Sequence, residues 1–231
     1  MKKGKLFGVG VGPGDPQLLT LKAISTIEAC PIVAAPRTRG GMAALDIVRG
    51  VMNLDGKTVI PLDFAMSHDR GEREASHRVA ADLVRVELEG GRDVAMLNLG
   101  DVSVYASFHY IWDILKPEGF EMAMIPGITS FCAAAAELGV SLTNMESPIR
   151  IIPNGTGRGG DADGETSIWM KSGRHLEKLL EQLRLEGRLD RAMLVQNCGM
   201  PNQRVYPSLQ GVDAANDYFS VVIVRDGEET A

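Results

Sequence analysis

The chain has 231 residues, of which 45% are hydrophobic and 23% are charged, and its formal net charge at pH 7 is -6. These proportions are typical of a globular protein with one large or two modest domains, and the negative charge argues against a general nucleic-acid binder. The three cysteines have no C-x-x-C spacing, so we expect neither a disulfide framework nor a zinc site, as suits a reducing cytoplasm. No apolar run approaches the roughly 20 residues that cross a bilayer, and glycines interrupt the apolar stretch near Met1, so no signal peptide is expected.

The first 145 residues alternate strand-like and helix-like patterns. We expect strands at 5–11, 32–35, 58–61, 93–99 and 120–125, and helices at 18–29, 42–52, 68–89, 103–115 and 132–138. The long helix has periodic apolar residues and stops at Gly90-Gly91, as a helix end often does. Strands that alternate with helices predict a mostly parallel sheet with helices on its faces.

The pattern changes after about Asn144. Further strands are expected at 149–152, 166–170, 192–196, 204–206 and 218–224, with one clear helix at 174–185. The segment 154–165 is rich in glycine and aspartate, which is typical of a loop, and it is a candidate lid. We therefore predict two α/β domains, 1–144 with a mostly parallel sheet and 145–231 with a mixed sheet, and a boundary near Asn144–Ser147.

The opening segment 6–22 (LFGVGVGPGDPQLLTLK) looks at first like a dinucleotide-binding fingerprint. The G-x-G-x-x-G pattern counted from Gly8 requires glycine where Pro13 stands, and counted from Gly10 it requires glycine where Asp15 stands. The loop is therefore suited to a tight turn and to close approach of a large group, but not to a dinucleotide pyrophosphate. Asp15 is a candidate helix N-cap, with Pro16 as the first helical residue.

Three loops of unusual composition each follow a predicted strand and open a helix, at 11–15, 99–105 and 126–130. Ligands of parallel sheets collect at the carboxyl ends of strands, so these loops are the candidate site. Taken singly, each has an ordinary alternative: Asp101, Thr129 and Ser130 also fit helix caps, and the glycine loop fits a plain turn. The four histidines match no metal-ligand spacing.

The order of these motifs is more specific than any one of them. G-x-G-x-G-P-G-D-P near the N-terminus, L-G-D…Y near residue 100 and P-G-I-T-S about 25 residues later resemble the tetrapyrrole (cobalt-precorrin) methylase family. The resemblance covers nearly the whole chain. Segments 10–23, 35–37, 104–108, 125–131, 169–171 and 218–220 are similar to the branch that methylates the C(20) meso carbon of precorrin-2 or cobalt-factor II in cobalamin biosynthesis.

This resemblance implies a homodimeric enzyme that uses S-adenosylmethionine as methyl donor, without a protein-bound metal, in a cleft between two α/β domains; the cysteine usage favours a cytoplasmic location. The residues that it implies for binding the donor are Val11, Gly100, Asp101, Val104, Thr129, Ser130, Met170, Asn197, Cys198, Phe219 and Ser220, with Gly199 beside them. The tetrapyrrole is expected near Gly12, Pro13, Asp15 and Arg37.

The chemistry of the implied reaction asks for two further kinds of residue. Tyr105 is the candidate base for the proton that the methylated carbon loses, against a packing role on a helix face. The tetrapyrrole carries many carboxylates, so the arginines to consider are Arg37, Arg39, Arg150 and Arg158, all of which also fit ordinary surface positions. Cys198 is interpreted as a packing residue, because no base is evident beside it.

Two positions depart from the family pattern. Val102 stands where the family commonly has proline after Gly-Asp, and Gln203-Arg204 stand where many relatives have a glutamate. The alternatives are a methylase for another ring position, for uroporphyrinogen III or for a protein side chain as in diphthine synthesis, and a protein that binds the tetrapyrrole or S-adenosylmethionine without turnover. A nicotinamide oxidoreductase is disfavoured by the failed fingerprint.

Overall fold

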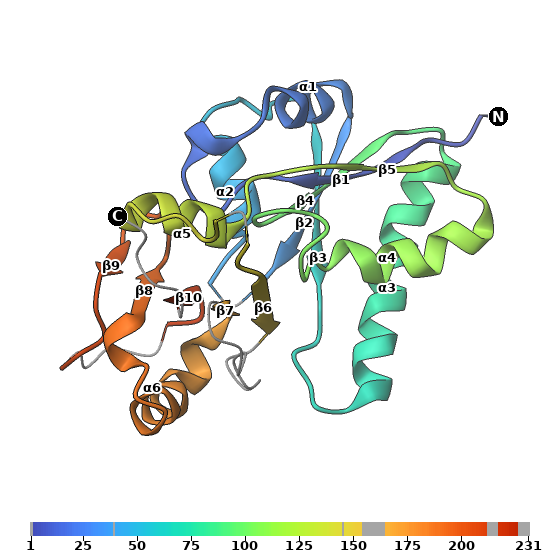
Figure 1. Cartoon of the computed structure of the whole chain (residues 1–231). Coiled ribbons are helices and arrows are strands. Elements are labelled where there is room, and N and C mark those ends of the chain that lie inside the picture. The colour runs from blue at the N-terminus through green and yellow to red at the C-terminus, as the bar shows by residue number, and fades with distance from the viewer. Residues whose placement is uncertain (1, 39, 145, 154–164, 212–216, 226–231) are drawn as a thin grey trace. The chain divides into compact units, whose positions relative to one another are not determined.

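The computed structural model describes residues 2–38, 40–144, 146–153, 165–211 and 217–225, with the side chain of Arg174 excepted. The chain divides into two compact units, Met1–Thr129 and Ser130–Ala231, and Figure 1 labels their elements. Each unit has a sheet of five strands, the first all parallel and the second mixed. The expected fold class is therefore confirmed.

The first unit is a parallel sheet with strand order β3-β2-β4-β1-β5. Its strands are β1 (Leu6–Gly10), β2 (Ile32–Arg37), β3 (Thr58–Asp63), β4 (Val94–Asn98) and β5 (Met122–Ile125). Its helices are η1 (Pro16–Leu18), α1 (Leu21–Ala29), α2 (Ala43–Arg49), α3 (Arg70–Glu89), α4 (Phe108–Leu115) and η2 (Lys116–Glu118).

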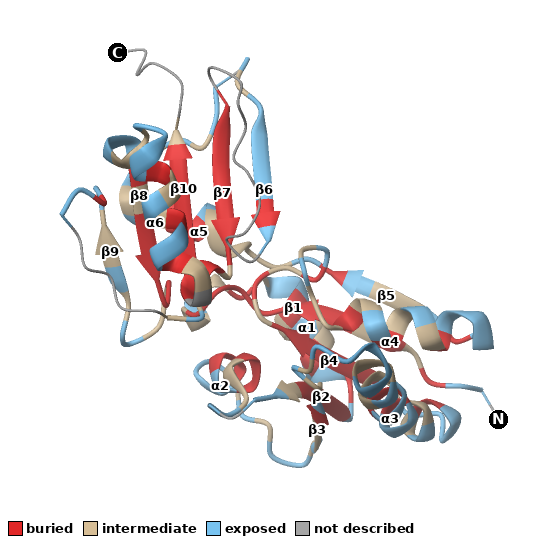
Figure 2. Cartoon of the chain, turned by 90° about the horizontal axis from the view of Figure 1, so that it is seen from below, coloured by how far each residue is buried: buried red, intermediate tan, exposed pale blue. Residues whose placement is uncertain are grey.

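Helices cover both faces of this sheet, because its central strands are apolar on both sides. In β4 Val94 and Met96 belong to the core formed with α3 and α4, whereas Ala95 and Leu97 belong to the core formed with α1 and α2. This alternation is the period of two that a strand imposes. Figure 1 shows α1 and α2 on one face and α3 and α4 on the other, and Figure 2 shows the central strands β1 and β4 as mostly buried.

Helix α1 begins later than the sequence predicts. The segment after Asp15 first forms η1, with the Asp15 carboxylate accepting from the Gln17 N–H at 2.8 Å and Pro16 in the first turn, as expected for a cap. α1 then starts at Leu21 under a second cap, Thr20, whose hydroxyl accepts from a backbone N–H at 3.1 Å. The prediction of one helix over 18–29 missed this second cap.

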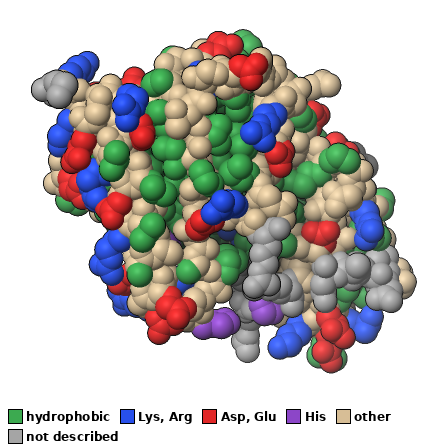
Figure 3. All heavy atoms as spheres, turned by 180° about the vertical axis from the view of Figure 1, so that it is seen from behind, with side chains coloured by type: hydrophobic (Ala, Val, Ile, Leu, Met, Phe, Trp, Pro, Cys, Tyr) green, Lys and Arg blue, Asp and Glu red, His purple; other side chains and the backbone are tan. Residues whose placement is uncertain are grey.

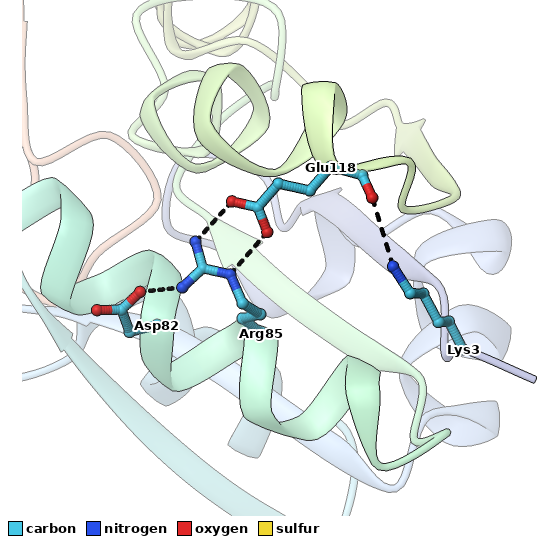
Figure 4. A network of polar contacts seen from close by, with 4 residues as sticks. All are labelled: Lys3, Asp82, Arg85 and Glu118. Atoms are coloured by element: carbon cyan, nitrogen blue, oxygen red, sulfur yellow. Dashed lines mark hydrogen bonds and ion pairs between the residues drawn. The ribbon is translucent and has the colours of Figure 1, made fainter. Parts of the chain in front are cut away.

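A polar network ties α3 to the end of α4 (Figure 4). The guanidinium of Arg85 donates from Nε and from a terminal nitrogen to the two carboxylate oxygens of Glu118 at 2.7 and 2.8 Å, and also to Asp82. Lys3 reaches the Glu118 carbonyl at 3.4 Å. The bidentate geometry fixes α3 against η2, since such a pair aligns two planar groups.

The second unit is a mixed sheet with strand order β6-β7-β10-β8-β9, in which β6 and β7 are parallel and the other neighbours antiparallel. Its elements are α5 (Ser130–Leu138), β6 (Ile149–Pro153), β7 (Thr166–Met170), η3 (Ser172–His175), α6 (Leu176–Leu185), η4 (Leu189–Arg191), β8 (Ala192–Gln196), β9 (Arg204–Tyr206) and β10 (Ser220–Arg225). The buried face of α6 packs on Trp169 and Leu194 of the sheet.

Helix α5 belongs to the second unit, although the sequence analysis assigns it to the first domain. It contacts β8, β9 and β10, and its buried residues are the alanines Ala133, Ala134 and Ala135. Small side chains let the helix lie close to the sheet. The observed division at Thr129–Ser130 therefore precedes the boundary expected near Asn144, because contacts distant in sequence decide where α5 packs. Among the described residues, no helix is both long enough and apolar enough to cross a membrane.

Candidate active site

The three loops that the sequence singles out follow adjacent strands. Because β4, β1 and β5 are parallel neighbours, their carboxyl ends lie at one edge of the first sheet, and the loops meet there. The Val11 N–H donates to the Asn98 carbonyl at 2.9 Å, and Gly12 and Gly100 exchange two backbone hydrogen bonds of 2.7 and 3.2 Å. Gly12 and Pro13 are buried in this junction.

Glycine is required at two of these positions by the close approach of the loops. A Cβ on Gly127 would lie 2.3 Å from the Gly100 carbonyl oxygen, and a Cβ on Gly10 would lie 2.6 Å from the Gly127 nitrogen. Both neighbours are backbone atoms, which cannot rotate away. The glycines of the opening loop therefore serve contact between loops of the protein itself, in addition to any ligand.

Asp101 joins two of the loops through both oxygens of its carboxylate. One oxygen accepts from the Ser103 N–H at 2.8 Å and from the Ser103 hydroxyl, and the other accepts from the Gly127 N–H at 2.8 Å. Burial acts to raise the pKa of Asp101, but the hydrogen bonds from Ser103 and Gly127 outweigh it, so the pKa is lowered. Asp101 is therefore a fixed anion at this edge.

The segment 101–107 forms turns, and α4 begins only at Phe108, so the expected helix over 103–115 is wrong at its start. The Asp101 side chain binds Ser103 within this segment and does not cap α4. The side-chain oxygen of the buried Asn98 instead accepts from the Phe108 N–H at 3.2 Å. Val104 is half-buried, and Tyr105 is 43% exposed with a left-handed backbone (φ 50°). The sequence analysis overlooked Asn98 as a positioning residue.

The remaining residues expected at this edge are ordered by the same loops. Asp15 caps η1, as described above, and is half-buried. Thr129 and Ser130 are half-buried at the start of α5, where the chain passes from the first unit into the second. The Thr20 hydroxyl donates to the Pro126 carbonyl at 3.5 Å, which holds this third loop against the start of α1.

A second edge of the same kind occurs in the second unit. β10 is antiparallel to β7 and β8, so its amino end lies beside their carboxyl ends. Met170 pairs with Val221, and Gln196 pairs with Ser220. The residues that the resemblance implies in this half, namely Met170, Asn197, Cys198, Gly199, Phe219 and Ser220, are thereby brought to one edge of the sheet.

Asp217, which the sequence analysis missed, organises this edge. Its carboxylate accepts from the Asn197 amide at 2.6 Å and from the Phe219 N–H at 3.2 Å, and its carbonyl accepts from the Ser220 hydroxyl at 2.6 Å. Asn197 has a left-handed backbone (φ 51°), which asparagine tolerates, and its own N–H donates to the Phe219 carbonyl at 2.9 Å. Phe219 and Ser220 are near Asp217 in sequence, but Asn197 follows a different strand, β8, and no local pattern links it to Asp217.

Gln203 holds the 197–200 loop to α5. Its side-chain oxygen accepts from the Gly199 N–H at 2.5 Å, and its amide nitrogen donates to the Glu137 carboxylate at 2.7 Å. A glutamate at 203 would accept the first bond but would set a second carboxylate against Glu137. The presence of glutamine at 203, where many relatives have glutamate, is therefore explained by Glu137 on α5, which accepts a hydrogen bond from the glutamine amide.

Cys198 is a packing residue in this structure. It is 5% exposed, and burial, with a smaller contribution from Glu137, raises the pKa of its thiol to about 11. The thiol is therefore protonated at neutral pH and unsuited to nucleophilic attack.

Two of the arginines expected to bind carboxylates already bind the protein's own acids. At the carboxyl ends of β2 and β3, Arg37 donates to both oxygens of Asp63 at 2.9 and 2.5 Å, and this hydrogen bonding lowers the pKa of Asp63. Arg150 donates to the buried Glu165 at 2.8 Å and pairs in register with Ser167, away from the carboxyl end of β7. Arg39 and Arg158, like segment 154–164, lie outside the described residues.

Charges of both signs are mixed on the face that Figure 3 shows, where lysine and arginine side chains lie beside acidic ones and hydrophobic side chains lie between them. Within the described residues no group of three or more His, Cys, Asp or Glu side chains gathers in a way that could hold a metal ion. The two candidate edges, one in each unit, are thus built from glycine-rich backbone, the carboxylates of Asp101 and Asp217, and a set of amide and hydroxyl groups.

The chain is therefore an α/β protein of two units, each with candidate site residues gathered at one edge of its sheet. A family model described as Tetrapyrrole (Corrin/Porphyrin) Methylases matches residues 5–212. The chain belongs to this family. The resemblance inferred from the motifs is therefore confirmed.

Relatives match over nearly the full length. A precorrin-2 C(20)-methyltransferase of Sinorhizobium sp is 30% identical over 238 residues, covering 96% of this chain and 95% of its own. A probable cobalt-precorrin-2 C(20)-methyltransferase of Methanocaldococcus jannaschii is 32% identical over 228 residues, covering 96% of each. The solved structure of a cobalt precorrin-4 methyltransferase has a TM-score of 0.72 at 19% identity, covering 96% of this chain and 94% of that one, and supports the fold.

Proposed function

We propose that this protein is an S-adenosylmethionine-dependent methyltransferase that methylates the C(20) meso carbon of precorrin-2 or cobalt-factor II in cobalamin biosynthesis. The observation that carries the proposal is the meeting of the three family motifs at adjacent strand ends, in a chain whose full-length relatives bear that activity in their names. We also propose a homodimer, as the resemblance implies, and a cytoplasmic location, which the cysteine usage favours.

The residues at both edges fit the chemical groups of S-adenosylmethionine. A sulfonium donor supplies an activated methyl group, so the protein needs neither a metal nor a covalent nucleophile. Asp101 is a fixed anion suited to a cationic ligand, and Gly10 and Gly127 let the loops after β1, β4 and β5 approach one another closely. In the second unit the half-buried Phe219 offers an aromatic face.

We propose the donor-binding residues as the resemblance implies them, each edge to be tested by its own variants. At the first edge they are Val11, Gly100, Asp101, Val104, Thr129 and Ser130. At the second edge they are Met170, Asn197, Cys198, Gly199, Phe219 and Ser220. Asn197 and Ser220 act through geometry that Asp217 fixes, so Asp217 is a positioning residue for them.

Catalysis in this proposal depends on alignment. Holding the nucleophilic meso carbon about 3–3.5 Å from the methyl carbon, in line with the S–CH3 bond that breaks as the C–CH3 bond forms, lowers the barrier by several kcal/mol. The charge of the donor disperses as the methyl moves, so exclusion of water by the buried loops favours transfer. The methylated carbon then loses a proton, and we propose Tyr105 as the base, with Gly12, Pro13, Asp15 and Arg37 near the tetrapyrrole.

The proposed role of Arg37 must take account of its existing ion pair with Asp63. Its guanidinium already binds Asp63 through two nitrogens, so a substrate carboxylate would share or displace that partner. Both side chains are more than half exposed, and such pairs exchange partners at low free-energy cost.

The test is an anaerobic incubation with methyl-labelled S-adenosylmethionine that offers precorrin-2, cobalt-factor II and uroporphyrinogen III in parallel. Product mass and carbon NMR locate the label. We expect one methyl at C(20), and the preferred substrate identifies the metal-free or the cobalt-containing route. Label at another ring position, or on uroporphyrinogen III alone, would refute the C(20) assignment, and binding of the donor without any transfer would favour a carrier protein.

A further inference from the structure

Helix α4 takes its N-terminal cap from another element. The first N–H groups of a helix need acceptors other than the carbonyls of that helix. Ser107, at the N-cap position, supplies no side-chain hydrogen bond to them. The Phe108 N–H instead donates to the side-chain oxygen of Asn98 at 3.2 Å, and Asn98 is the last residue of β4. A strand residue therefore caps the helix that follows it.

Asn98 is itself held in one orientation. It is 3% exposed, and its amide nitrogen donates to the Met96 carbonyl at 2.9 Å, which directs the side-chain oxygen at the Phe108 N–H. Its backbone carbonyl accepts from the Val11 N–H at 2.9 Å, so the same residue also joins β4 to the loop after β1. The segment 99–107 therefore leaves from Asn98 and returns to it.

The side chain of Phe108 provides a second anchor at the same point. It is fully buried, and a Cβ on Gly8 would lie 2.7 Å from its ring carbons, so the ring lies directly against the backbone of β1. The Trp112 ring, one turn further along α4, meets it edge-on at 5.6 Å between ring centroids. Asn98 thus fixes the backbone of Phe108 and Gly8 leaves room for its ring, which together set where α4 begins.

The segment between these anchors has two halves with separate supports. The first half is held by the Asp101 carboxylate, as described above, and by Val102, which is buried in the core with α3 and α4. The second half contains Tyr105, which is 43% exposed and lies three residues before Phe108. The hydrogen bond from Phe108 to Asn98 acts on this second half, because it fixes the point at which that half ends.

We propose that Asn98 is a positioning residue that sets the place of Tyr105 in the active site. The inference rests on the proposed function and deepens it, since Tyr105 is the base of that proposal. A displacement of about 1 Å in a reacting group can lower a rate about 100-fold, so the fixed start of α4 bears directly on catalysis. Asn98 acts through the start of α4 and leaves the anchor of Asp101 unchanged.

The test compares three variants of the full chain. Asn98→Leu has a similar size and removes both side-chain hydrogen bonds, whereas Asn98→Asp keeps an oxygen that accepts from the Phe108 N–H. Leu88→Ala is the matched control, because Leu88 is fully buried near the end of α3, where its carbonyl binds the Gly4 N–H at the opposite edge of the sheet, and its truncation lowers stability without touching the cap. We measure kcat with labelled S-adenosylmethionine and the tetrapyrrole that the wild type methylates, donor affinity by calorimetry, and Tm.

We expect Asn98→Leu to lower kcat by about 10-fold to 100-fold while its affinity for S-adenosylmethionine changes by less than about threefold. Asn98→Asp should keep a higher kcat than Asn98→Leu and a slower exchange of the Phe108 amide hydrogen, because the acceptor is retained. Leu88→Ala should lower Tm with kcat near that of the wild type. Added to Tyr105→Phe, Asn98→Leu should lower kcat little further, because the two changes remove the same contribution.

The proposal is overturned if Asn98→Leu is no less active than Leu88→Ala, if its donor affinity falls as far as kcat, or if its effect adds fully to that of Tyr105→Phe. If Asn98→Leu does not fold, Asn98→Ser, whose hydroxyl is one bond shorter than the amide, takes its place with the same expected results. A wild type that methylates no tetrapyrrole contradicts the proposed function itself. An active wild type with an equally active Asn98→Leu contradicts only the role of Asn98.

Discussion

Replacement of Asp101 by asparagine tests whether this carboxylate joins two loops of the first unit. The two side chains have nearly the same shape, but asparagine offers one acceptor oxygen and one amide group. If its oxygen serves Ser103, the amide faces the Gly127 N–H, which then loses its partner; the flipped amide faces Ser103 instead. Either arrangement leaves a backbone donor unpaired.

The size of the effect follows from that lost bond. A hydrogen bond to a charged group contributes about 1.5–3 kcal/mol, and an unpaired buried donor costs about 1–3 kcal/mol. Asp101 is only half-buried, so solvent offsets part of this, and we expect Asp101→Asn to lower the free energy of unfolding by about 1–2 kcal/mol at pH 7. S-adenosylmethionine should bind about tenfold or more weakly, because the third loop loses its anchor as well as its anion.

The pH dependence gives a second readout. The pKa of Asp101 is lower in the folded protein than its ordinary value of about 3.9, so its contribution is present above that pH and is lost as pH falls through the folded pKa. Urea unfolding at pH 7 and near pH 3 should therefore give a difference between wild type and variant that shrinks on acidification. Ser103→Ala is the matched control, since it keeps the carboxylate and its bond to Gly127. Equal stability at pH 7, or an undiminished difference in acid, would refute the reasoning.

Three further changes test other contacts. Gly127→Ala would set a Cβ 2.3 Å from a backbone carbonyl, so we expect loss of donor binding by calorimetry and a lower melting temperature; unchanged binding would contradict the loop contact. Gln203→Glu would set two carboxylates together and raise a carboxyl pKa in the folded state, so its stability deficit in urea should shrink as pH falls, and adding Glu137→Gln should relieve it; a deficit independent of pH would count against this account. Arg85→Met should lower the free energy of unfolding by about 1 kcal/mol in dilute buffer and less in 1 M salt; equal loss in both would exclude an ionic contribution.

The strands of this chain could be predicted closely from sequence because each is a short apolar run bounded by turn residues. The expected strands at 166–170, 192–196 and 204–206 coincide with β7, β8 and β9. Helix starts were harder to predict, because a candidate capping side chain can bind other backbone groups instead of the first turn of the helix. Asp101 resembles a cap for α4 in the sequence, yet Ser103 and Gly127 already occupy both of its oxygens, and α4 begins beyond the turn.

The candidate site divides in the same way. The loops after β1, β4 and β5 could be found from composition, and parallel topology then brings them together. The residues that hold the side chains of the site in place could not be found from composition. Asp217, before β10, binds Asn197, after β8, and Asp63 of β3 binds Arg37 of β2. Such pairings depend on strand order, which local patterns do not carry.

Both glycine and larger residues have positive φ in the turns at these edges. Where only the turn matters, glycine is the least strained residue, and Gly12, Gly100 and Gly199 all have positive φ. Where a larger residue takes the same conformation, its side chain must offset the strain. Asn197 does so through Asp217, within the fold. Tyr105 and Lys171 also have positive φ, so their replacement by glycine should remove backbone strain and leave the melting temperature unchanged or higher; a lower melting temperature would show that their side chains contribute more to the fold than the strain costs.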